Sequence, residues 1–557
     1  MAENNVFTWP DYLLFASAII ISLSIGIYQM LKRRKENDLT ASELLVADRK
    51  MNILPVSLSM TASLVSGILI LGVPHEVVKY GGVYYLTGLS YLLNYAFCAH
   101  CVVPVFYRLR LCSGYQYLEL RFHKYVRRIA SLTFVLQTIF YMSVVIYAPA
   151  ITISQTTGMP TSVAIALTGI VCTLYTAIGG LRAVIWTDVF QIIVMITSLI
   201  VTVVIGIQNA GGTSEVSRII SEGDRWPYFD FDPDPRLIYS FWSCVLGSTF
   251  SGMASFSFQQ MIIQRFVSLP TKKAAIASVY IAMPVSLLIL TLLCVTGLII
   301  YANYADCDPI RIIHSYNKIL PHFITQALGK YSGLPGLFVS CIFCGALSTI
   351  SSGINSLAAV TYYDFVDPLY LKMRKEPIGS KTSGKITIAI ALIFGSLAVL
   401  FSYVIHHLNP NILHTTLIIL NTIAGPITGM FVLGLFVPWA NTKGTLVGFS
   451  AAVIMTLWLG IGNAVTNSKL KEHHLPNNST NVTECTPIPP VDRNLYKNRT
   501  GWDGFYSISY LWFAFIAVAI VLILGNVVSL ITGGTTSKKK KYTIWKYKKI
   551  PIPPRST

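Results

Sequence analysis

Thirteen long apolar runs constrain the fold of this chain more than any other feature of its sequence. Each run is about 20 residues long, which is the length that an α-helix needs to cross the hydrocarbon core of a bilayer. The sequence therefore predicts an all-α, polytopic membrane protein with about thirteen transmembrane helices. We place the spans at 10–31, 53–79, 82–107, 129–156, 160–179, 183–208, 238–264, 274–303, 334–363, 386–406, 411–438, 443–464 and 507–532.

The composition excludes a soluble protein of the same length. A chain of 557 residues would suit about three or four soluble domains. Charged residues, however, make up only 12% of the chain, about half of the roughly 25% found in ordinary globular proteins. Hydrophobic residues reach 53%, and a surface of that composition is stable against lipid rather than against water.

The basic residues are placed so that they orient the chain. Lysine and arginine outnumber aspartate and glutamate by 42 to 24, and 25 of the 42 basic residues lie in four segments, at 32–50, 108–128, 372–385 and 538–555. Each segment borders an apolar run, as cytoplasmic loops do. The charge therefore indicates a membrane surface and not a nucleic acid. With an odd number of spans, we expect an extracellular N-terminus and a cytoplasmic C-terminus.

Two other segments have the features of extracellular loops. Segment 209–237 carries six acidic residues against three arginines. Loop 465–506 contains N-glycosylation sequons at Asn477, Asn478, Asn481 and Asn498. Cys307 and Cys485 also fall in predicted outside segments, so a disulfide bond between them is an open alternative to two free thiols. The cysteines show no metal-site spacing.

Several spans contain residues that interrupt helices. The second span has five hydroxyl side chains around Gly67 and Gly72, the ninth is rich in serine, and the eleventh contains Gly425-Pro426. Unwound backbone at membrane depth is tolerated only inside protein or against a water-filled cavity. Interrupted spans in both halves of a chain favour a secondary transporter with inverted repeats. The alternative is that small residues only let helices pack closely.

A carboxylate and an amide lie on one face of the sixth span. Asp188 and Gln191 follow the Gly179-Gly180 turn in the sequence IGGLRAVIWTDVFQ. A charged side chain in a span costs on the order of 2.5–3.5 kcal/mol on insertion scales. We therefore expect Asp188 to face a cation or an aqueous path. The alternative is a structural Asp–Arg pair.

The ninth span carries a polar stripe formed by Gly345, Ser348, Thr349 and Ser352. Adjacent hydroxyls, together with carbonyls exposed by a broken helix, suit a hard monovalent cation that prefers several oxygen ligands. The alternative is that these hydroxyls donate back to carbonyls of their own helix.

These motifs resemble the sodium:solute symporter family over nearly the whole chain. The resemblance rests on 104–122, 146–151, 178–191, 332–341 and 345–361, and the branch it indicates contains the sodium-coupled monocarboxylate, multivitamin and iodide transporters. It implies a leucine-transporter-like fold of two inverted five-helix repeats. We expect a transmembrane domain at 1–532, with repeats at about 53–208 and 238–438, followed by a basic cytoplasmic tail at 533–557.

The resemblance also implies a sodium site between the broken second span and the ninth. Ser348 and Thr349 would supply hydroxyls, while Gly345, Ala62 and Val65 would supply backbone carbonyls. Four further positions match residues proposed to assist sodium in the iodide branch, namely Ser63, Ser66, Asp188 and Gln191.

The substrate positions depart from the sugar and iodide members. Leu69 stands where sugar and iodide members carry glutamine, and Tyr91 stands where iodide carriers have one. Gln259-Gln260 replaces an Asn-Gln pair. The resemblance therefore favours a small organic anion, either a monocarboxylate or a vitamin-like molecule. Tyr141 and Tyr147 are candidate pocket residues, although aromatic packing is the alternative role.

The sequence thus predicts a plasma-membrane symporter that moves a small solute together with sodium by alternating access. A solute sensor with the same fold, and a symporter for iodide, sugar, inositol or choline, are the alternatives. No nucleophile–base pair indicates an enzyme, since His75 and Glu76 are adjacent and face apart on a helix. We expect contact with membrane lipid and none with nucleic acid, and the sequence does not determine the oligomeric state.

Overall fold

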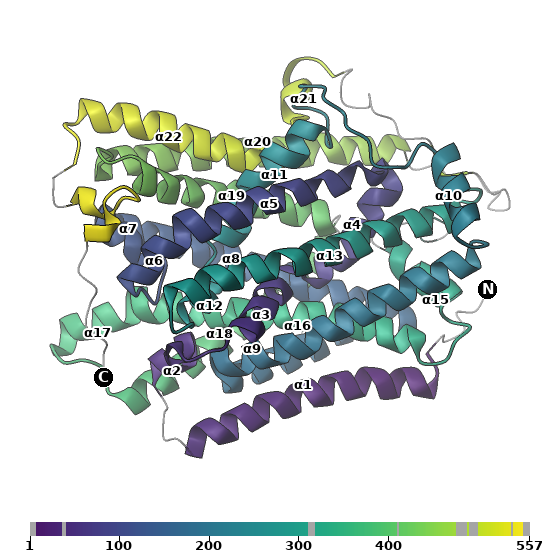
Figure 1. The fold of residues 1–557 in the computed structure, drawn as a ribbon, viewed down its shortest axis with the longest axis horizontal. Coiled ribbons are helices and arrows are strands. Elements are labelled where there is room, and N and C mark those ends of the chain that lie inside the picture. Colours follow the sequence, from purple (N-terminus) through teal and green to yellow (C-terminus); the bar gives the residue numbers. More distant parts are fainter. Residues whose placement is uncertain are drawn as a thin grey trace.

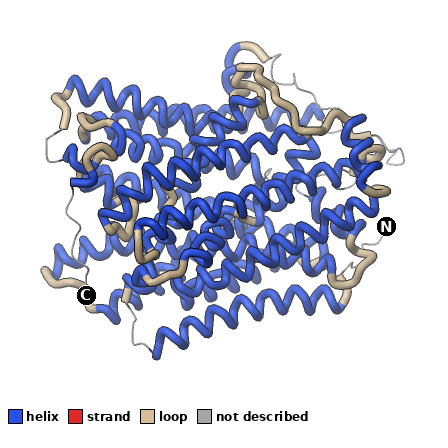
Figure 2. Tube along the Cα trace, in the orientation of Figure 1, coloured by secondary structure: helices blue, strands red, loops and turns tan. Residues whose placement is uncertain are grey.

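The computed structural model describes residues 7–35, 40–309, 313, 318–408, 412–474, 487–489, 499–535 and 539–549. Within these ranges the backbone forms helices, turns and loops and no strand (Figure 2). The prediction of an all-α protein is confirmed.

Long helices cross the molecule roughly side by side (Figure 1). They are α1 (Trp9–Lys35), α3 (Ile53–Leu64), α4 (Gly67–Tyr80), α5 (Thr87–Phe97), α8 (Lys124–Thr157), α9 (Thr161–Asn209), α13 (Lys272–Tyr304), α16 (Leu334–Thr361), α18 (Ser380–Leu408), α19 (Ile412–Phe436), α20 (Thr442–His474) and α22 (Phe513–Ile531). Shorter helices connect or extend them: α2 (Ala41–Val46), α6 (Val103–Leu109), α7 (Gln116–Arg121), α10 (Thr213–Glu222), α11 (Ser248–Gly252), α12 (Gln260–Val267), α15 (Ile319–Ala327), α17 (Asp367–Arg374) and α21 (Gly501–Tyr506).

Eleven of the thirteen predicted spans are long and apolar enough to cross a bilayer. Ten helices of the described chain meet this condition singly, and the bent pair α3–α4 meets it as one span. The predicted span at 160–179 contains a shorter apolar helix, Thr161–Leu174. The predicted span at 238–264 consists of π-helical turns at Ser243–Gly247 and Met253–Ser257, α11 and part of α12. The predicted spans at 160–179 and 238–264 therefore do not meet this condition in the described chain.

A glycine separates the fifth and sixth predicted spans as expected. Helix α9 consists of two helical segments joined at a kink, where Gly180 has φ 64° and ψ 179°. A side chain would strain the backbone at this positive φ, whereas glycine adopts it readily. The kink lets the two halves of α9 run in different directions.

Helix α16 lies at the centre of the bundle. Its best apolar window is 94% buried, whereas that of α1 is only 22% buried at the periphery. A helix that is buried on nearly every side belongs to the core of the bundle. α16 contacts α3, α4, α8 and α9, so its polar stripe faces other helices and not lipid.

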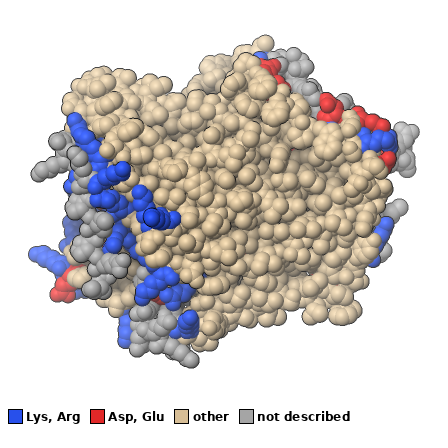
Figure 3. Space-filling view, in the orientation of Figure 1, with Lys and Arg blue, Asp and Glu red and all other residues tan. Residues whose placement is uncertain are grey.

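The four basic segments meet at one end of the molecule, where most of the visible Lys and Arg gather (Figure 3). Three hydrogen bonds join these segments: Arg49 Nη2 to the Arg110 carbonyl (2.8 Å), Arg108 Nη2 to the Lys548 carbonyl (2.7 Å), and the Ala41 amide to Ser383 Oγ (3.2 Å). The four basic segments, which the sequence predicts to lie on the cytoplasmic side, are therefore together at one end of the folded protein.

The predicted outside segments meet at the other end. Arg225 donates to the Pro489 carbonyl at 2.7 Å, and Arg236 donates to the Arg499 carbonyl at 3.1 Å. These bonds tie the acidic segment 209–237 to described parts of loop 465–506. Cys307 is disulfide-bonded, and its partner lies outside the described residues. The sequons at Asn477, Asn478, Asn481 and Asn498 also lie outside them.

We expect the end that carries loop 465–506 to be extracellular. Enzymatic deglycosylation of the protein from cells should lower its apparent mass on a gel, and replacing all four sequon asparagines by glutamine should abolish that shift. A protease or antibody that reaches this loop only after the plasma membrane is permeabilised would contradict the orientation.

Candidate functional site

The candidate site begins at the joint between α3 and α4. The two helices are bent by 59°, and Val65 and Ser66 between them have non-helical backbone. The Ser66 hydroxyl caps α4 by accepting from the Leu69 amide at 3.4 Å. Carbonyls that end α3 are therefore released from the helix and are available to other donors or to a cation.

Helix α16 contacts this joint through its polar stripe. Ser348 Oγ donates to the Ala62 carbonyl at 2.8 Å and also lies 3.0 Å from the Gly345 carbonyl. Thr349 Oγ1 is buried and has no hydrogen-bond partner. A buried hydroxyl without a partner costs about 1–3 kcal/mol. Its lone pairs are free to coordinate a hard cation, which prefers oxygen ligands.

Gly345 permits the close approach of α16 to the joint. A methyl group added at Gly345 would lie 3.2 Å from the Val65 carbonyl oxygen and 2.8 Å from Ile70 Cδ1. Both separations are tighter than ordinary carbon contacts. Four of the five residues predicted to supply sodium ligands are therefore brought together, namely Ala62, Val65, Gly345 and Ser348. The fifth, Thr349, follows Ser348 on α16, and its hydroxyl makes no hydrogen bond with the joint.

Other serines of α16 donate back to carbonyls of their own helix, which is the alternative that the sequence left open for this polar stripe. Ser351 and Ser352 both donate to the Ser348 carbonyl, at 3.0 and 2.7 Å, and Ser356 donates to the Ser352 carbonyl at 2.8 Å. Back-bonding thus accounts for these three hydroxyls. Ser348 differs because it donates to a backbone carbonyl at the end of α3, and Thr349 differs because it reaches no partner.

Asp188 forms a fully buried ion pair, which is the alternative considered for it from the sequence. Arg265 Nη2 lies 2.9 Å from Asp188 Oδ2, and both side chains are 0% exposed. Ser59 donates to the same carboxylate oxygen at 2.5 Å. The other oxygen, Asp188 Oδ1, has no hydrogen-bond partner.

Arg265 is the functional residue that the sequence analysis missed. It also donates to Ser59 at 2.7 Å and to Ser352 at 2.6 Å, so one guanidinium joins α12, α9, α3 and α16. No sequence motif marks Arg265, but a general physical rule could have identified it. A carboxylate inside a span needs a cation, and Arg265 lies directly beyond the apolar run 238–264.

Of the remaining assisting residues, Ser63 lies beside this ion pair, Ser66 caps α4 at the joint, and Gln191 follows Asp188 by three residues on α9. Ser63 donates to the Ser59 carbonyl at 2.8 Å and lies 2.9 Å from Ser352 Oγ. Gln191 is 0% exposed, and neither its amide nitrogen nor its amide oxygen has a partner. Unpaired buried amides are rare, so Gln191 and Asp188 Oδ1 retain hydrogen-bonding capacity.

The substrate candidates divide into two groups. Leu69, Tyr91 and Tyr141 are partly buried and pack against the same hydrophobic cluster, and Tyr141 also interacts with the Ser66 side chain at the joint. Gln259 is the extended residue that precedes α12, at the break in the seventh predicted span. Leu69 and Gln259 thus lie next to helix breaks, and Tyr141 contacts Ser66 at one of them.

The other two candidates are engaged elsewhere. Gln260 accepts from the Gly114 amide at 2.8 Å and donates to the Cys112 carbonyl at 2.9 Å, so its amide fixes the loop before α7. Tyr147 is 3% exposed, and its ring centroid lies 5.8 Å from that of His406 on α18. Tyr147 therefore packs against another aromatic side chain, which is the alternative role considered for it from the sequence.

The chain is similar to known sodium-coupled transporters in sequence. The sequence profile of the Sodium:solute symporter family matches residues 44–451. The sodium-dependent multivitamin transporter of Oryctolagus cuniculus is 37% identical over 544 residues, covering 95% of this chain and 84% of that protein. Sodium-coupled monocarboxylate transporter 1 of Homo sapiens is 36% identical over 547 residues, covering 95% and 88%.

Solved structures share the fold. An outward-open, substrate-bound Na+-coupled sialic acid symporter matches with a TM-score of 0.75 and 20% identity, over 95% of this chain and 99% of that one. The nucleobase-cation-symport-1 family transporter Mhp1, in a closed conformation, matches with a TM-score of 0.51 and 11% identity, over 90% and 97%. The predicted leucine-transporter-like fold is confirmed.

We expect the Asp188–Arg265 pair to act as a unit in stability. Asp188→Asn or Arg265→Gln alone leaves a buried charge without its partner and should destabilise the protein by about 3–5 kcal/mol. The double variant removes both charges and should recover part of that loss. Thermal unfolding of the purified protein in detergent measures all three. Additive losses in the double variant would show that the two side chains do not depend on each other.

Proposed function

The chain belongs to the sodium:solute symporter family, and we propose that it carries a small organic anion, a monocarboxylate or vitamin-like carboxylate, into cells across the plasma membrane. Sodium is the co-transported ion of this family. We propose three things beyond the family: the class of substrate, the plasma membrane as the location, and the residues that bind sodium or the substrate.

One observation supports the proposed sodium site more directly than any other. Ser348 on α16 bonds to the Ala62 carbonyl of the broken helix, and the neighbouring Thr349 hydroxyl is buried without a partner. An ion between them would receive hydroxyl oxygens from α16 and carbonyls from the end of α3. The geometry supports Ala62, Val65, Gly345, Ser348 and Thr349 as ligands.

We assign Asp188 a supporting role at this site. Its ion pair with Arg265 fixes Ser59 and Ser352, and Ser63 lies 2.9 Å from Ser352 Oγ. Because Arg265 already neutralises the carboxylate, Asp188 positions the hydroxyls near the ion path. Gln191 retains an unpaired amide next to this network in sequence and can assist an ion in transit.

Sodium at this joint would couple the two solutes. The ion holds α3 and α4 against α16, which favours one conformation of the bundle and prepares the substrate site. Each sodium ion that enters down a potential of about 100 mV contributes roughly 2.3 kcal/mol. That energy corresponds to about fiftyfold accumulation of substrate before any sodium concentration gradient is counted.

The features around the joint support a carboxylate substrate. The N-terminus of α4 begins at Gly67, directly after the joint, and a helix N-terminus carries partial positive charge that favours an anion. Leu69, Tyr91 and Tyr141 provide apolar and aromatic surface beside it. Relatives named for multivitamins and monocarboxylates support the same class of solute.

The positions of the breaks support the two proposed repeats. The first span of the repeat at 53–208 breaks at Val65 and Ser66, and the first span of the repeat at 238–438 breaks at Phe258 and Gln259. Corresponding interruptions in two halves are the usual sign of a central binding site. Gln259 is therefore retained as a substrate candidate.

Removing the Ser348 or Thr349 oxygen should lower apparent sodium affinity about tenfold or more, which equals roughly 1.4 kcal/mol per tenfold. Ser348→Ala and Thr349→Val each withdraw one oxygen without opening a large cavity. Thr349→Ser keeps the oxygen and should be much milder. Uptake measured against sodium concentration at equal surface expression gives the affinity.

Ser351→Ala is the matched control for these variants. Ser351 lies on the same helix and donates back to the Ser348 carbonyl, so its loss should leave the sodium activation curve in place. If Ser348→Ala and Thr349→Val also leave the curve unmoved, the site assignment is wrong.

Iodide and glucose should be poor substrates of the unmodified protein, while a monocarboxylate or biotin should be taken up only with sodium. Leu69 offers no polar partner to iodide or a sugar, and an unpaired polar group in a pocket costs about 1–3 kcal/mol. Radiotracer uptake with and without sodium tests this, and Leu69→Gln should admit a more polar solute. Robust iodide uptake would contradict the proposal, and substrate-evoked currents without uptake would indicate a sensor.

A further inference from the structure

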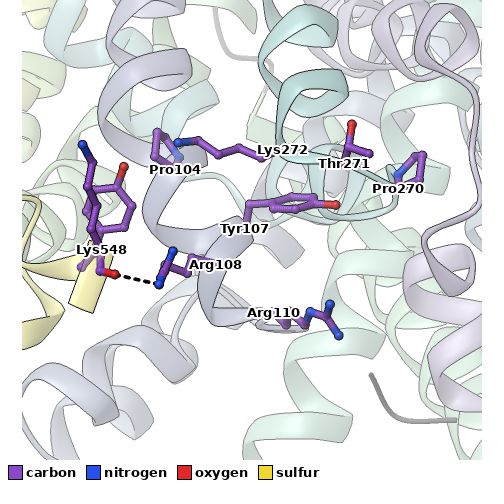
Figure 4. Close-up of a pocket in the computed structure, with 9 residues that line it drawn as sticks. Pro104, Tyr107, Arg108, Arg110, Pro270, Thr271, Lys272 and Lys548 are labelled. Carbon is purple, nitrogen blue, oxygen red and sulfur yellow. Dashed lines mark hydrogen bonds between the residues drawn. The ribbon is translucent and has the colours of Figure 1, made fainter. Parts of the chain in front are cut away.

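A pocket of about 410 Å³ opens at the basic end of the molecule, away from the sodium and substrate residues. Figure 4 shows Lys548 on one side of it and Thr271 with Pro270 on the other, with the Tyr107 ring between them. The walls come from three regions far apart in sequence: α6, the segment that leads into α13, and the C-terminal tail.

The lining of this pocket is strongly cationic. Arg108, Arg110, Lys272 and Lys548 all line it, and none of its lining residues is acidic. Helix α13 begins at Lys272, with Thr271 as its N-cap. The N-terminus of this long helix adds partial positive charge to the same space. Four cations and a helix N-terminus around one cavity favour a multiply charged anion.

The walls are held in place by specific contacts. Tyr107 Oη donates to the Leu269 carbonyl at 3.1 Å, and Arg108 Nη2 donates to the Lys548 carbonyl at 2.7 Å. Lys272 Nζ lies 5.8 Å from the centre of the Tyr547 ring. The pocket therefore has a defined shape to which the tail contributes.

The tail residues beside the pocket dock on the end of α19. The Ile544 amide donates to the Leu435 carbonyl at 3.0 Å, and Thr543 is 0% exposed. Trp545 donates to the Phe436 carbonyl while its side chain stays 68% exposed. Exposed tryptophans of membrane proteins concentrate at the level of the lipid headgroups.

We propose that this pocket binds a phosphate-bearing anion supplied by the headgroup of an anionic phospholipid in the adjoining leaflet. Cytoplasmic leaflets carry such lipids, and basic segments next to spans attract them. Arginine and lysine are the side chains that bind phosphate. The headgroup would bridge Lys272 on the α13 side and Lys548 on the tail, so its binding would also strengthen the docking of the tail.

Two matched pairs of lysines test the site. Lys272 and Lys548 line the pocket, whereas their neighbours Lys273 and Lys546 do not. All four are exposed, so replacing them should not prevent folding. The full-length protein would be placed in phosphatidylcholine nanodiscs with or without phosphatidylinositol bisphosphate. Binding of a labelled lipid and the thermal unfolding temperature would be measured for Lys272→Gln/Lys548→Gln and for Lys273→Gln/Lys546→Gln.

The pocket variant should bind the lipid about tenfold more weakly or worse and lose most of the thermal stabilisation that the lipid gives. The matched control should behave as the unmodified protein does. Equal losses in both variants would show diffuse attraction to a basic surface and overturn the site, as would no loss in either. Soluble inositol trisphosphate provides the second arm. If it binds as tightly as the lipid and with the same lysine dependence, the source is a soluble anion and not the membrane.

Discussion

The contact between α16 and the joint of α3 and α4 determines how the rest of the bundle is arranged. It requires a glycine at position 345, because a side chain there would meet the Val65 carbonyl and Ile70. It also requires hydroxyls that can replace the hydrogen bonds lost where the helix is broken, as Ser348 does at Ala62. Backbone without partners inside a membrane protein costs several kcal/mol per group. The broken span is therefore stable only while α16 lies against it.

The Asp188–Arg265 pair holds this contact from the side. A buried ion pair is a costly way to stabilise a fold, since removing both charges from water cancels most of their attraction. Here one guanidinium reaches α3, α9 and α16 from α12. A pair of this kind fixes the relative register of four elements, which a set of apolar contacts of the same size would do less specifically. That geometry suits a site that must hold a small ion at defined distances from several helices.

The two ends of the molecule differ in charge, and both differ from its apolar centre. The basic segments converge at one end, and the acidic segment meets described parts of the long loop at the other (Figure 3). The tail at 539–549 is part of the folded protein, because Tyr117 and Arg108 donate to its carbonyls and Thr543 is buried. The helix bundle and the basic pocket are thus linked through α6 and α13.

The sequence by itself determined the helical class, the positions of eleven long spans, the segregation of charge and the kink at Gly180, because each depends on hydrophobicity or backbone freedom within a short stretch. The serine stripe and the broken second span could be recognised for the same reason. The family resemblance implied that the two lie together at a sodium site. Only the tertiary structure decided that Arg265 is the partner of Asp188, that Gln260 fixes the loop at 112–114, and that Thr349 is left without a partner. These facts depend on side chains that are 77 to 148 positions apart in the chain or on the absence of any neighbour. No local pattern records such relations, because the packing of whole helices sets them.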